Sequence, residues 1–127
     1  MILRKVVYND WPLLLCWRND YTTRINCQNV DIVEEESHKK WLQSRLAEVD
    51  FEIYIAIRNN IPIGTIRSET GGTDRISKIS WTIGPEYRNK GLGLEMARLY
   101  ISKLNREIRI EVKSDVKIPI TNTTAKP

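Results

Sequence analysis

The residues best suited to chemistry in this sequence lie where a strand-like segment passes through a short loop into a helix-like segment. Residues 79–83 have the strand pattern, and Gly91 and Gly93 open the helical one. A loop that leads into a helix directs free backbone N–H groups at one point, where the helix dipole also favours an anion. The two glycines let a phosphate approach the backbone closely, and Arg88 and Lys90 add positive charge. The segment therefore favours binding of a pyrophosphate.

Other interpretations of the same loop remain open at this point. A glycine-containing turn between a strand and a helix, flanked by two solvated bases, needs no ligand, and short motifs of this kind are weak evidence alone. The segment is not a P-loop, because the Gly-x-x-x-x-Gly-Lys-Ser/Thr spacing is missing. It is not a dinucleotide fingerprint, since a third glycine is missing and the strand follows a meander. A nucleotide-binding domain of another fold is a third hypothesis.

Hydrophobic periodicity predicts the elements that hold this loop. Apolar residues alternate with other residues over 51–58, and Asn59-Asn60 fits a hairpin turn. We expect strands at residues 2–8, 51–58, 61–66, 76–83 and 107–113. Apolar residues at three- and four-residue spacings predict helices at residues 11–19, 34–48 and 91–104. The order β-α-α-β-β-β-α-β predicts one α/β (α+β) domain over residues 1–127, with a mainly antiparallel meander ending in a βα crossover.

Composition agrees with one globular domain and limits its partners. The 127 residues are 41% hydrophobic and 28% charged, a balance typical of a folded domain. Lys and Arg number 20 against 16 Asp and Glu, and the net charge of +4 suits an anionic ligand. The bases are scattered, however, so nucleic-acid binding is not expected. No apolar run approaches the roughly 20 residues that a bilayer span needs, so no membrane association is expected.

The cysteines and the histidine do not predict a metal site. Cys16, Cys27 and His38 lack the paired spacing of zinc ligands. The sequence opens with Met-Ile-Leu-Arg-Lys and shows no secretory signal, and its two cysteines fit reduced thiols. We therefore expect a cytoplasmic protein without a metal.

The loop residues also carry a family resemblance. Arg88-x-x-Gly91-x-Gly93, preceded by Pro85-Glu86-Tyr87, resembles the acyl-CoA loop of the GNAT superfamily of N-acetyltransferases. The order of elements from residue 2 to about 113 also fits that family. The resemblance implies a GNAT-like acyl-CoA N-acyltransferase fold, with a mixed, mainly antiparallel central sheet flanked by helices. It implies acetyl-CoA as cosubstrate and a primary amine as acceptor.

The resemblance further implies which residues bind the cosubstrate. Backbone amides of residues 88–93 would hold the CoA pyrophosphate, and the strand at residues 81–83 would pair with the pantetheine arm as an added strand. An amide near Ile83 would face the acetyl carbonyl and stabilise the oxyanion of the tetrahedral intermediate. The expected cofactor-binding residues are Trp81, Thr82, Ile83, Arg88, Asn89, Lys90, Gly91, Leu92 and Gly93.

The amino-terminal half resembles one branch of the family in particular. Trp17-Arg18-Asn19, Arg24 and Ser37-His38-x-x-Trp41 resemble the branch that acetylates amino groups on nucleotide-linked deoxysugars. A related branch, which acetylates protein N-termini including ribosomal ones, shares part of this pattern. The aromatic rings could stack on a sugar or base, and Arg18 or Arg24 could meet a phosphate. The resemblance implies a small-molecule nucleotide-sugar acceptor, with substrate-binding residues Trp17, Arg18, Asn19, His38 and Trp41.

The same acceptor-side residues also fit structural roles. Trp17 and Trp41 lie at helical apolar spacing, as core residues do, and His38 fits a packed, hydrogen-bonded histidine. His38 is also the one weak candidate for proton transfer. The proton-transfer residues are otherwise unassigned.

The carboxyl-terminal sequence departs from the family. Members continue after the strand matched here by 107–113 with an asparagine, a helix, a tyrosine followed by Lys-x-Gly-Phe, and two last strands. Residues 114–127 show none of these, and Asn122 has the wrong spacing for the asparagine. The expected fold is therefore truncated after the fifth strand, and 107–113 would present an exposed edge.

This departure leaves several hypotheses open. A decayed coding sequence, a trimmed chain and a homodimer that supplies the missing cover all fit the sequence. The chain is then either an active N-acetyltransferase or a catalytically inactive CoA-binding module.

Overall fold

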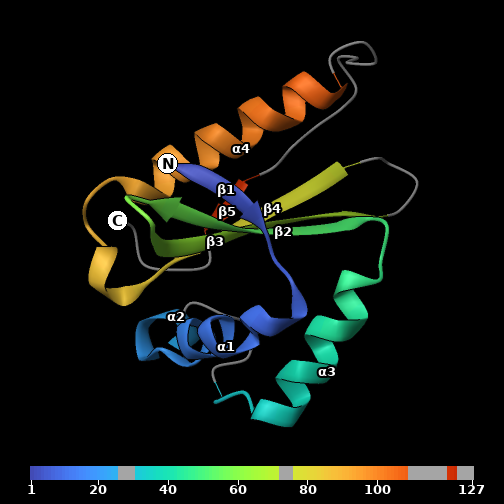
Figure 1. Ribbon diagram of the computed structural model, residues 1–127, viewed down its shortest axis with the longest axis vertical. Coiled ribbons are helices and arrows are strands. Elements are labelled where there is room, and N and C mark those ends of the chain that lie inside the picture. The colour runs from blue at the N-terminus through green and yellow to red at the C-terminus, as the bar shows by residue number, and fades with distance from the viewer. Residues whose placement is uncertain (26–30, 72–75, 109–119, 123–127) are drawn as a thin grey trace.

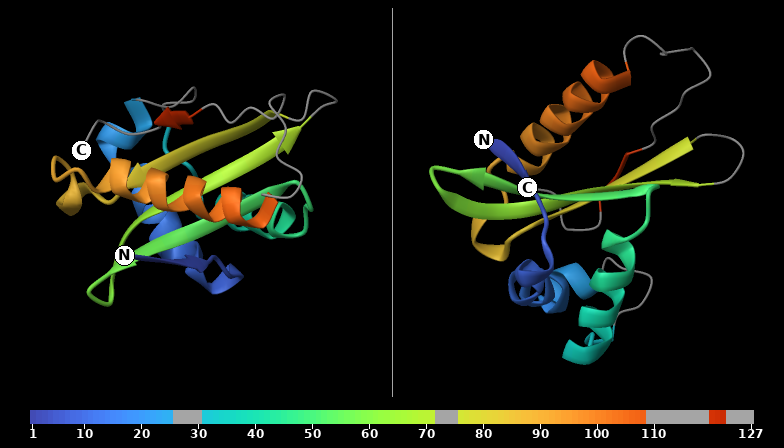
Figure 2. Two further views of the ribbon diagram at one scale, coloured as in Figure 1. Left: turned by 90° about the horizontal axis from the view of Figure 1, so that it is seen from above. Right: turned by 45° about the vertical axis from the view of Figure 1, so that its right-hand side comes forward.

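A computed structural model describes residues 1–25, 31–71, 76–108 and 120–122, which form a central sheet with helices on both faces (Figure 1). The strands are β1 (Ile2–Lys5), β2 (Phe51–Arg58), β3 (Ile61–Gly71), β4 (Ile76–Ile83) and β5 (Ile120–Asn122). The helices are α1 (Trp11–Asn19), α2 (Tyr21–Ile25), α3 (Glu35–Leu46) and α4 (Leu92–Ile108), with 3-10 turns η1 (Tyr8–Asp10) and η2 (Pro85–Tyr87). Helices α1, α2 and α3 cover one face of the sheet, and α4 covers the other (Figures 1 and 2).

The strands lie in the spatial order β1-β2-β3-β4-β5. The first four are antiparallel to their neighbours, whereas β5 runs parallel to β4. The β2–β3 hairpin turns through Asn59 and Asn60, with φ of 53° and 65°. Two successive positive φ values match the twist of the flanking strands, and asparagine tolerates them better than most residues. The predicted hairpin turn is confirmed.

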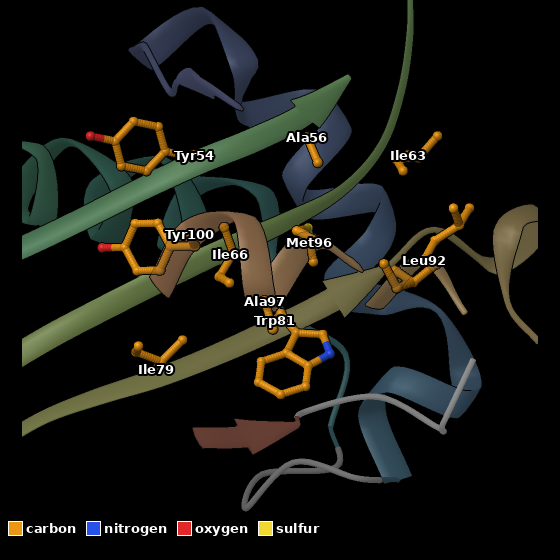
Figure 3. Packing of buried hydrophobic residues seen from close by; sticks show 11 residues of the cluster. Tyr54, Ala56, Ile63, Ile66, Ile79, Trp81, Leu92, Met96, Ala97 and Tyr100 are labelled. Carbon is orange, nitrogen blue, oxygen red and sulfur yellow. The ribbon is translucent and has the colours of Figure 1, made fainter. Parts of the chain in front are cut away.

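Alternation along the strands divides the core into two clusters, one on each face of the sheet. On β2, Tyr54 and Ala56 point to the α4 side, whereas Ile53 and Ile55 point to the α1–α3 side. The α4-side cluster (Figure 3) comprises Tyr54, Ala56, Ile63, Ile66, Ile79, Trp81, Ile83, Leu92, Met96, Ala97 and Tyr100. The α1/α3-side cluster comprises Val6, Leu14, Trp17, Leu42, Phe51, Ile53 and Ile55.

The structure confirms most of the predicted elements. The strands expected at 51–58 and 76–83 and the helix expected at 11–19 have the predicted bounds. The strand expected at 61–66 extends to Gly71, and α2 was not predicted. The mixed, mainly antiparallel sheet flanked by helices is the fold class that the sequence indicated.

The prediction of a strand at residues 107–113 is wrong for its first two residues. Helix α4 continues to Ile108, so Glu107 and Ile108 are helical, and residues 109–113 lie outside the described residues. Neither Gly nor Pro follows Leu104 before Ile108, and each residue added to an existing helix gains a hydrogen bond. The fifth strand lies instead at Ile120–Asn122, in a tail for which no strand was predicted.

Candidate active site

The β4–α4 loop, residues 84–91, begins where β4 leaves the sheet and ends at the first turn of α4. Asn89 and Gly91 have φ of 63° and 74°. A Cβ built on Gly91 would meet no atom within 4 Å, so solvent or a ligand can reach the backbone there. The N–H of Glu95 bonds to the Gly91 carbonyl at 3.2 Å, which closes the first turn of the helix. The loop therefore ends in an exposed, unobstructed stretch of backbone at the N-terminus of α4.

This helix N-terminus suits an anion. Helical geometry leaves the first backbone N–H groups of α4 without acceptors inside the helix, and the dipole of this 17-residue helix places positive potential there. Lys90 is exposed beside it, and the backbone of Gly93 is buried. The start of α4 is therefore suited to an anion such as a pyrophosphate, which the sequence predicted at residues 88–93.

Arg88 does not contribute its charge to that position. Its guanidinium donates to Asp20 Oδ2 at 2.8 Å, to Thr23 Oγ1 at 2.8 Å and to the carbonyl oxygen of Ile83 at 3.2 Å. Its side chain is only 9% exposed. The structure thus turns this side chain inward against the α1–α2 corner, and any role in binding the pyrophosphate falls to its backbone.

The outer edge of β4 carries a backbone N–H that points away from β3. The Gly84 N–H bonds to the Ile63 carbonyl at 2.8 Å, so Gly84 faces β3. Successive residues of a strand direct their backbone groups to opposite sides, and the N–H of Ile83 therefore faces the β5 side. Among the described residues, pairing of β4 with β5 ends at Trp81 with Asn122. Thr82 and Ile83 extend beyond that pairing, whereas Trp81 lies within it.

A cavity of about 370 Å³ is lined by residues of the amino-terminal helices and of strands β2–β4. It reaches β4 at Ser80, Trp81 and Thr82, next to the start of the β4–α4 loop. The described residues that line it are Leu14, Trp17, Arg18, Thr23, Val33, Ser37, His38, Trp41, Ile53, Thr65, Arg67, Ser80, Trp81 and Thr82. A volume of this size is typical of a small-molecule site.

Four of the five predicted substrate-binding residues line this cavity: Trp17, Arg18, His38 and Trp41. The fifth, Asn19, has a structural role instead. Its Nδ2 donates to the Val33 carbonyl at 2.9 Å, and its Oδ1 accepts the Val33 N–H at 2.7 Å. Asn19 therefore joins the end of α1 to the segment that precedes α3.

The two tryptophans belong to the packed core region and also line the cavity. Trp17 is 5% exposed and belongs to the α1/α3-side cluster, and Trp41 packs against that cluster. Both rings also line the cavity. A Cβ built on Gly84 would lie 2.8 Å from Trp17 Nε1, so the β4–α4 loop packs directly on this indole. One set of rings thus forms the core and the cavity wall together.

Sequence reasoning missed the contribution of the sheet to the cavity. Thr65 and Arg67 of β3 and Ser80 and Thr82 of β4 all line it. Arg67 lies with its guanidinium carbon 5.6 Å from the centre of the Trp41 ring. The strand alternation could have indicated them, because they are the residues between Ile66, Ile79, Trp81 and Ile83, which face α4.

Two arginines lie in the cavity wall. Arg18 and Arg67 line it, and none of its described lining residues is Asp or Glu. The remaining wall is aromatic, aliphatic or hydroxyl-bearing. An arginine guanidinium recognises phosphate and carboxylate groups and stacks on aromatic rings.

His38 is a buried, uncharged imidazole at the cavity. It is 4% exposed and stacks on Trp41 with ring centroids 5.7 Å apart. Burial lowers its pKa below the ordinary value; a hydrogen bond with the Trp11 backbone opposes this shift, and the nearby Arg18 charge adds to it. Its Nε2 has no hydrogen-bond partner among the described residues. A neutral imidazole nitrogen of this kind can accept a proton.

Tyr100 lies on the opposite face of the sheet and is not part of this site. Its hydroxyl donates to Glu52 Oε2 at 2.7 Å and shares a hydrogen bond of 2.6 Å with Ser68 Oγ. Burial raises its pKa, and the Glu52 carboxylate raises it further. This phenol is therefore a satisfied core group.

Within the described part of the chain, no cluster of three His, Cys, Asp or Glu residues could hold a metal ion. Nor is any helix there long and apolar enough to cross a membrane.

Comparison with solved structures finds the same fold in several acetyltransferases. An acetyltransferase from Thermus thermophilus has a TM-score of 0.69 at 16% identity, over 80% of this chain and 67% of that one. A ribosomal-protein-alanine N-acetyltransferase from Brucella melitensis has a TM-score of 0.64 at 23% identity, over 86% of this chain and 67% of that one. Aminoglycoside acetyltransferase AAC(6')-Ib in complex with coenzyme A has a TM-score of 0.70 at 22% identity, over 83% and 67%. This chain thus spans about two thirds of the length of each.

Family comparison gives the assignment. A search of curated proteins gave no significant match. A family model described as an acetyltransferase (GNAT) domain matches residues 1–121, nearly the whole chain. GNAT acetyltransferases use acetyl-CoA as acetyl donor. The chain therefore belongs to the GNAT acetyltransferase family and is an N-acetyltransferase domain.

Proposed function

We propose that this domain transfers the acetyl group of acetyl-CoA to the primary amine of a nucleotide-linked amino-deoxysugar. The observation that carries the proposal is a convergence at the end of β4. The open backbone of the β4–α4 loop begins there, and the positively charged, aromatic cavity reaches β4 at Thr82. An acyl donor on one side of this strand end and an amine on the other would meet at Ile83.

The donor site is proposed from backbone groups. The N-terminal amides of α4 and the loop around Gly91 would hold the pyrophosphate, because they combine free donors, positive potential and unobstructed access. The pantetheine arm would lie along the outer edge of β4 beyond the β4–β5 pairing, where Ile83 directs its backbone outward, whereas the backbone of Thr82 faces β3. The outward N–H of Ile83 would then donate to the carbonyl oxygen as negative charge develops on it.

The chemistry needs few further groups. A neutral amine attacks the thioester carbon, the C–S bond breaks, and the CoA thiolate takes a proton while the new amide loses one. Holding both reactants at one strand end supplies much of the rate. We propose His38 as the group that accepts the amine proton, directly or through water, since its imidazole is neutral and its Nε2 is uncommitted within the described structure.

The acceptor is proposed from the charge of the cavity. Acceptors such as aminoglycosides and spermidine carry several positive charges, and a wall with Arg18 and Arg67 but no described carboxylate would repel them. A nucleotide-linked amino sugar brings phosphates for the guanidinium groups, and its rings can stack on Trp17 or Trp41. A protein amino terminus, the second acceptor class that the sequence left open, supplies no phosphate.

The direct test compares release of the CoA thiol across acceptors. The arms are a nucleotide-linked amino-deoxysugar, the same sugar without its nucleotide, spermidine, an aminoglycoside and a peptide with a free amino terminus. We expect the nucleotide-linked sugar to have the highest kcat/KM. Faster turnover of spermidine or the aminoglycoside would refute the anionic acceptor, and faster turnover of the peptide would support the second class. Binding of CoA without turnover of any amine would indicate an inactive module.

A matched pair of variants locates the phosphate contact. Arg67→Gln should lower kcat/KM for the nucleotide-linked sugar by about 10- to 100-fold, the cost of one charge-assisted hydrogen bond. The same variant should change kcat/KM little for the sugar without its nucleotide. Arg58→Gln removes an equal charge from the exposed end of β2 and should affect neither acceptor.

A further inference from the structure

We infer that a hydrogen-bonded cluster positions the β4–α4 loop against the acceptor cavity. The cluster, called the tie below, consists of Asp20, Thr23 and Arg88. The inference rests on the proposed function in taking the loop as the donor side and the cavity as the acceptor side. In this account Arg88 is a positioning residue: it fixes the geometry of both sides and does not contact the phosphates of CoA through its side chain.

The tie spans two parts of the chain that are far apart in sequence. Arg88 donates to Asp20 Oδ2 and to Thr23 Oγ1, each at 2.8 Å. The same Asp20 oxygen accepts the Thr23 N–H at 3.2 Å and so caps the start of α2. The Arg88 and Asp20 side chains are 9% and 21% exposed, and Thr23 is 1% exposed. An ion pair this well shielded is screened less by salt than an exposed one.

The tie touches both sides of the site. On the donor side, Arg88 Nε donates to the Ile83 carbonyl at 3.2 Å, which fixes the peptide next to the outward Ile83 N–H. On the acceptor side, Thr23 lines the cavity. The close approach of Gly84 to Trp17 joins the same two parts of the chain. A shift of the loop would therefore move both sides of the reaction together.

The charge arrangement separates a tie from a phosphate ligand. The Asp20 carboxylate neutralises the Arg88 guanidinium, so the positive potential at the loop comes from α4 and Lys90. If Arg88 bound phosphate, removal of the Asp20 charge would release the guanidinium and strengthen CoA binding. If Arg88 is a tie, the same change would loosen the loop and weaken binding. The two accounts predict opposite signs.

Asp20→Asn is the variant that tests this, because asparagine caps a helix as well as aspartate does and only the charge is lost. Hydrogen exchange would follow two loop amides with defined acceptors: Gly84, bonded to Ile63, and Tyr87, bonded to Gly84. The Val6 amide, bonded to Ile53 beside β1, serves as the internal control. Calorimetry would give the Kd for CoA of Asp20→Asn, Arg88→Gln and the double variant.

We expect Asp20→Asn to speed exchange at Gly84 and Tyr87 about 10-fold, with no change at Val6, and to weaken CoA binding. The double variant should resemble Arg88→Gln alone, because partners in one contact are not additive. With an acceptor in hand, kcat should fall by about 10- to 100-fold, as expected for misplaced reactants. Unchanged exchange with unchanged or tighter CoA binding would overturn the tie. If the wild-type chain binds no CoA, the proposed function fails, and the exchange result alone still decides the tie.

Discussion

The proposed donor side of the site consists of backbone groups, whereas the proposed acceptor side consists of side chains. The donor side consists of backbone: the amides at the start of α4, the open Gly91 and the outer edge of β4. The acceptor side consists of side chains contributed by α1, α2, α3, β2, β3 and β4. A site made of backbone groups can be formed by any residues that adopt the required backbone conformation. A site made of side chains depends on the identity of each residue. We therefore expect the donor side to tolerate most side-chain changes and the acceptor side to set specificity.

Core substitutions on the two faces of the sheet should have the largest effects and should distinguish the two sides of the site most clearly. Leu42 in the α1/α3-side cluster and Met96 in the α4-side cluster are both fully buried. Leu42→Ala and Met96→Ala should each lower the free energy of unfolding by about 2–5 kcal/mol, because each leaves a cavity. Urea denaturation measures the loss. Leu42→Ala should also raise KM for the acceptor, and an equal effect of Met96→Ala on that KM would contradict the division.

Gly84→Ala should act at the junction of the two sides. The added Cβ would lie 2.8 Å from Trp17 Nε1, so either the loop or the indole must shift. Overpacking of this kind costs about 1–3 kcal/mol. Thermal unfolding gives the stability change, and a change in tryptophan fluorescence, to which Trp17 contributes with three other tryptophans, reports a displaced ring. A variant of unchanged stability with unchanged CoA and acceptor binding would show that this contact is not needed.

His38 makes the acceptor side sensitive to pH. Its pKa in the folded chain lies below the ordinary value, chiefly because of burial, so the unfolded chain takes up the proton first as pH falls. Stability should therefore decrease as pH falls from the unfolded pKa of about 6.5 towards the folded one, by at most about 1.4 kcal/mol per pH unit. The sequence has only one histidine, so this window belongs to His38. His38→Gln should remove the slope, and an unchanged slope in that variant would contradict the assignment.

The smallest effect is expected at the surface, where an ion pair lies outside both sides of the site. Arg4 Nη1 contacts Asp10 Oδ2 at 2.9 Å, with side chains 42% and 15% exposed. Arg4→Gln should lower stability by no more than about 1 kcal/mol, because solvent screens such pairs, and should leave CoA binding unchanged. The comparison with Asp20→Asn separates an ion pair that only adds stability from one that positions the loop.

The sequence predicted the β4–α4 loop because its signals are local. The spacing of Arg88, Gly91 and Gly93 after a strand pattern was sufficient to locate the loop and the start of α4. The direction of the Arg88 side chain was not predictable, since its side-chain partners, Asp20 and Thr23, lie 68 and 65 residues away. The position of β5 was not predictable for the same reason, because it depends on pairing with β4, which is distant in sequence.

The acceptor side was only partly predictable for the same reason. The motifs around Trp17 and Trp41 located the helical wall of the cavity. Arg67 was missed because an arginine on an antiparallel strand fits a solvated position equally well, and only the packing of α3 over that face makes it part of a cavity. Asn19, predicted to bind substrate, joins two segments of the backbone instead.

Calorimetric titration with acetyl-CoA tests the central claim, that the β4–α4 loop is the donor site, most directly. The wild-type chain would be compared with Gly91→Asp, which places a negative charge at the open loop, and with Val49→Asp, which places the same charge on a side chain that is 94% exposed between α3 and β2. We predict binding to the wild-type chain and to Val49→Asp, and none to a folded Gly91→Asp. Equal affinity of Gly91→Asp and the wild-type chain would show that CoA binds elsewhere.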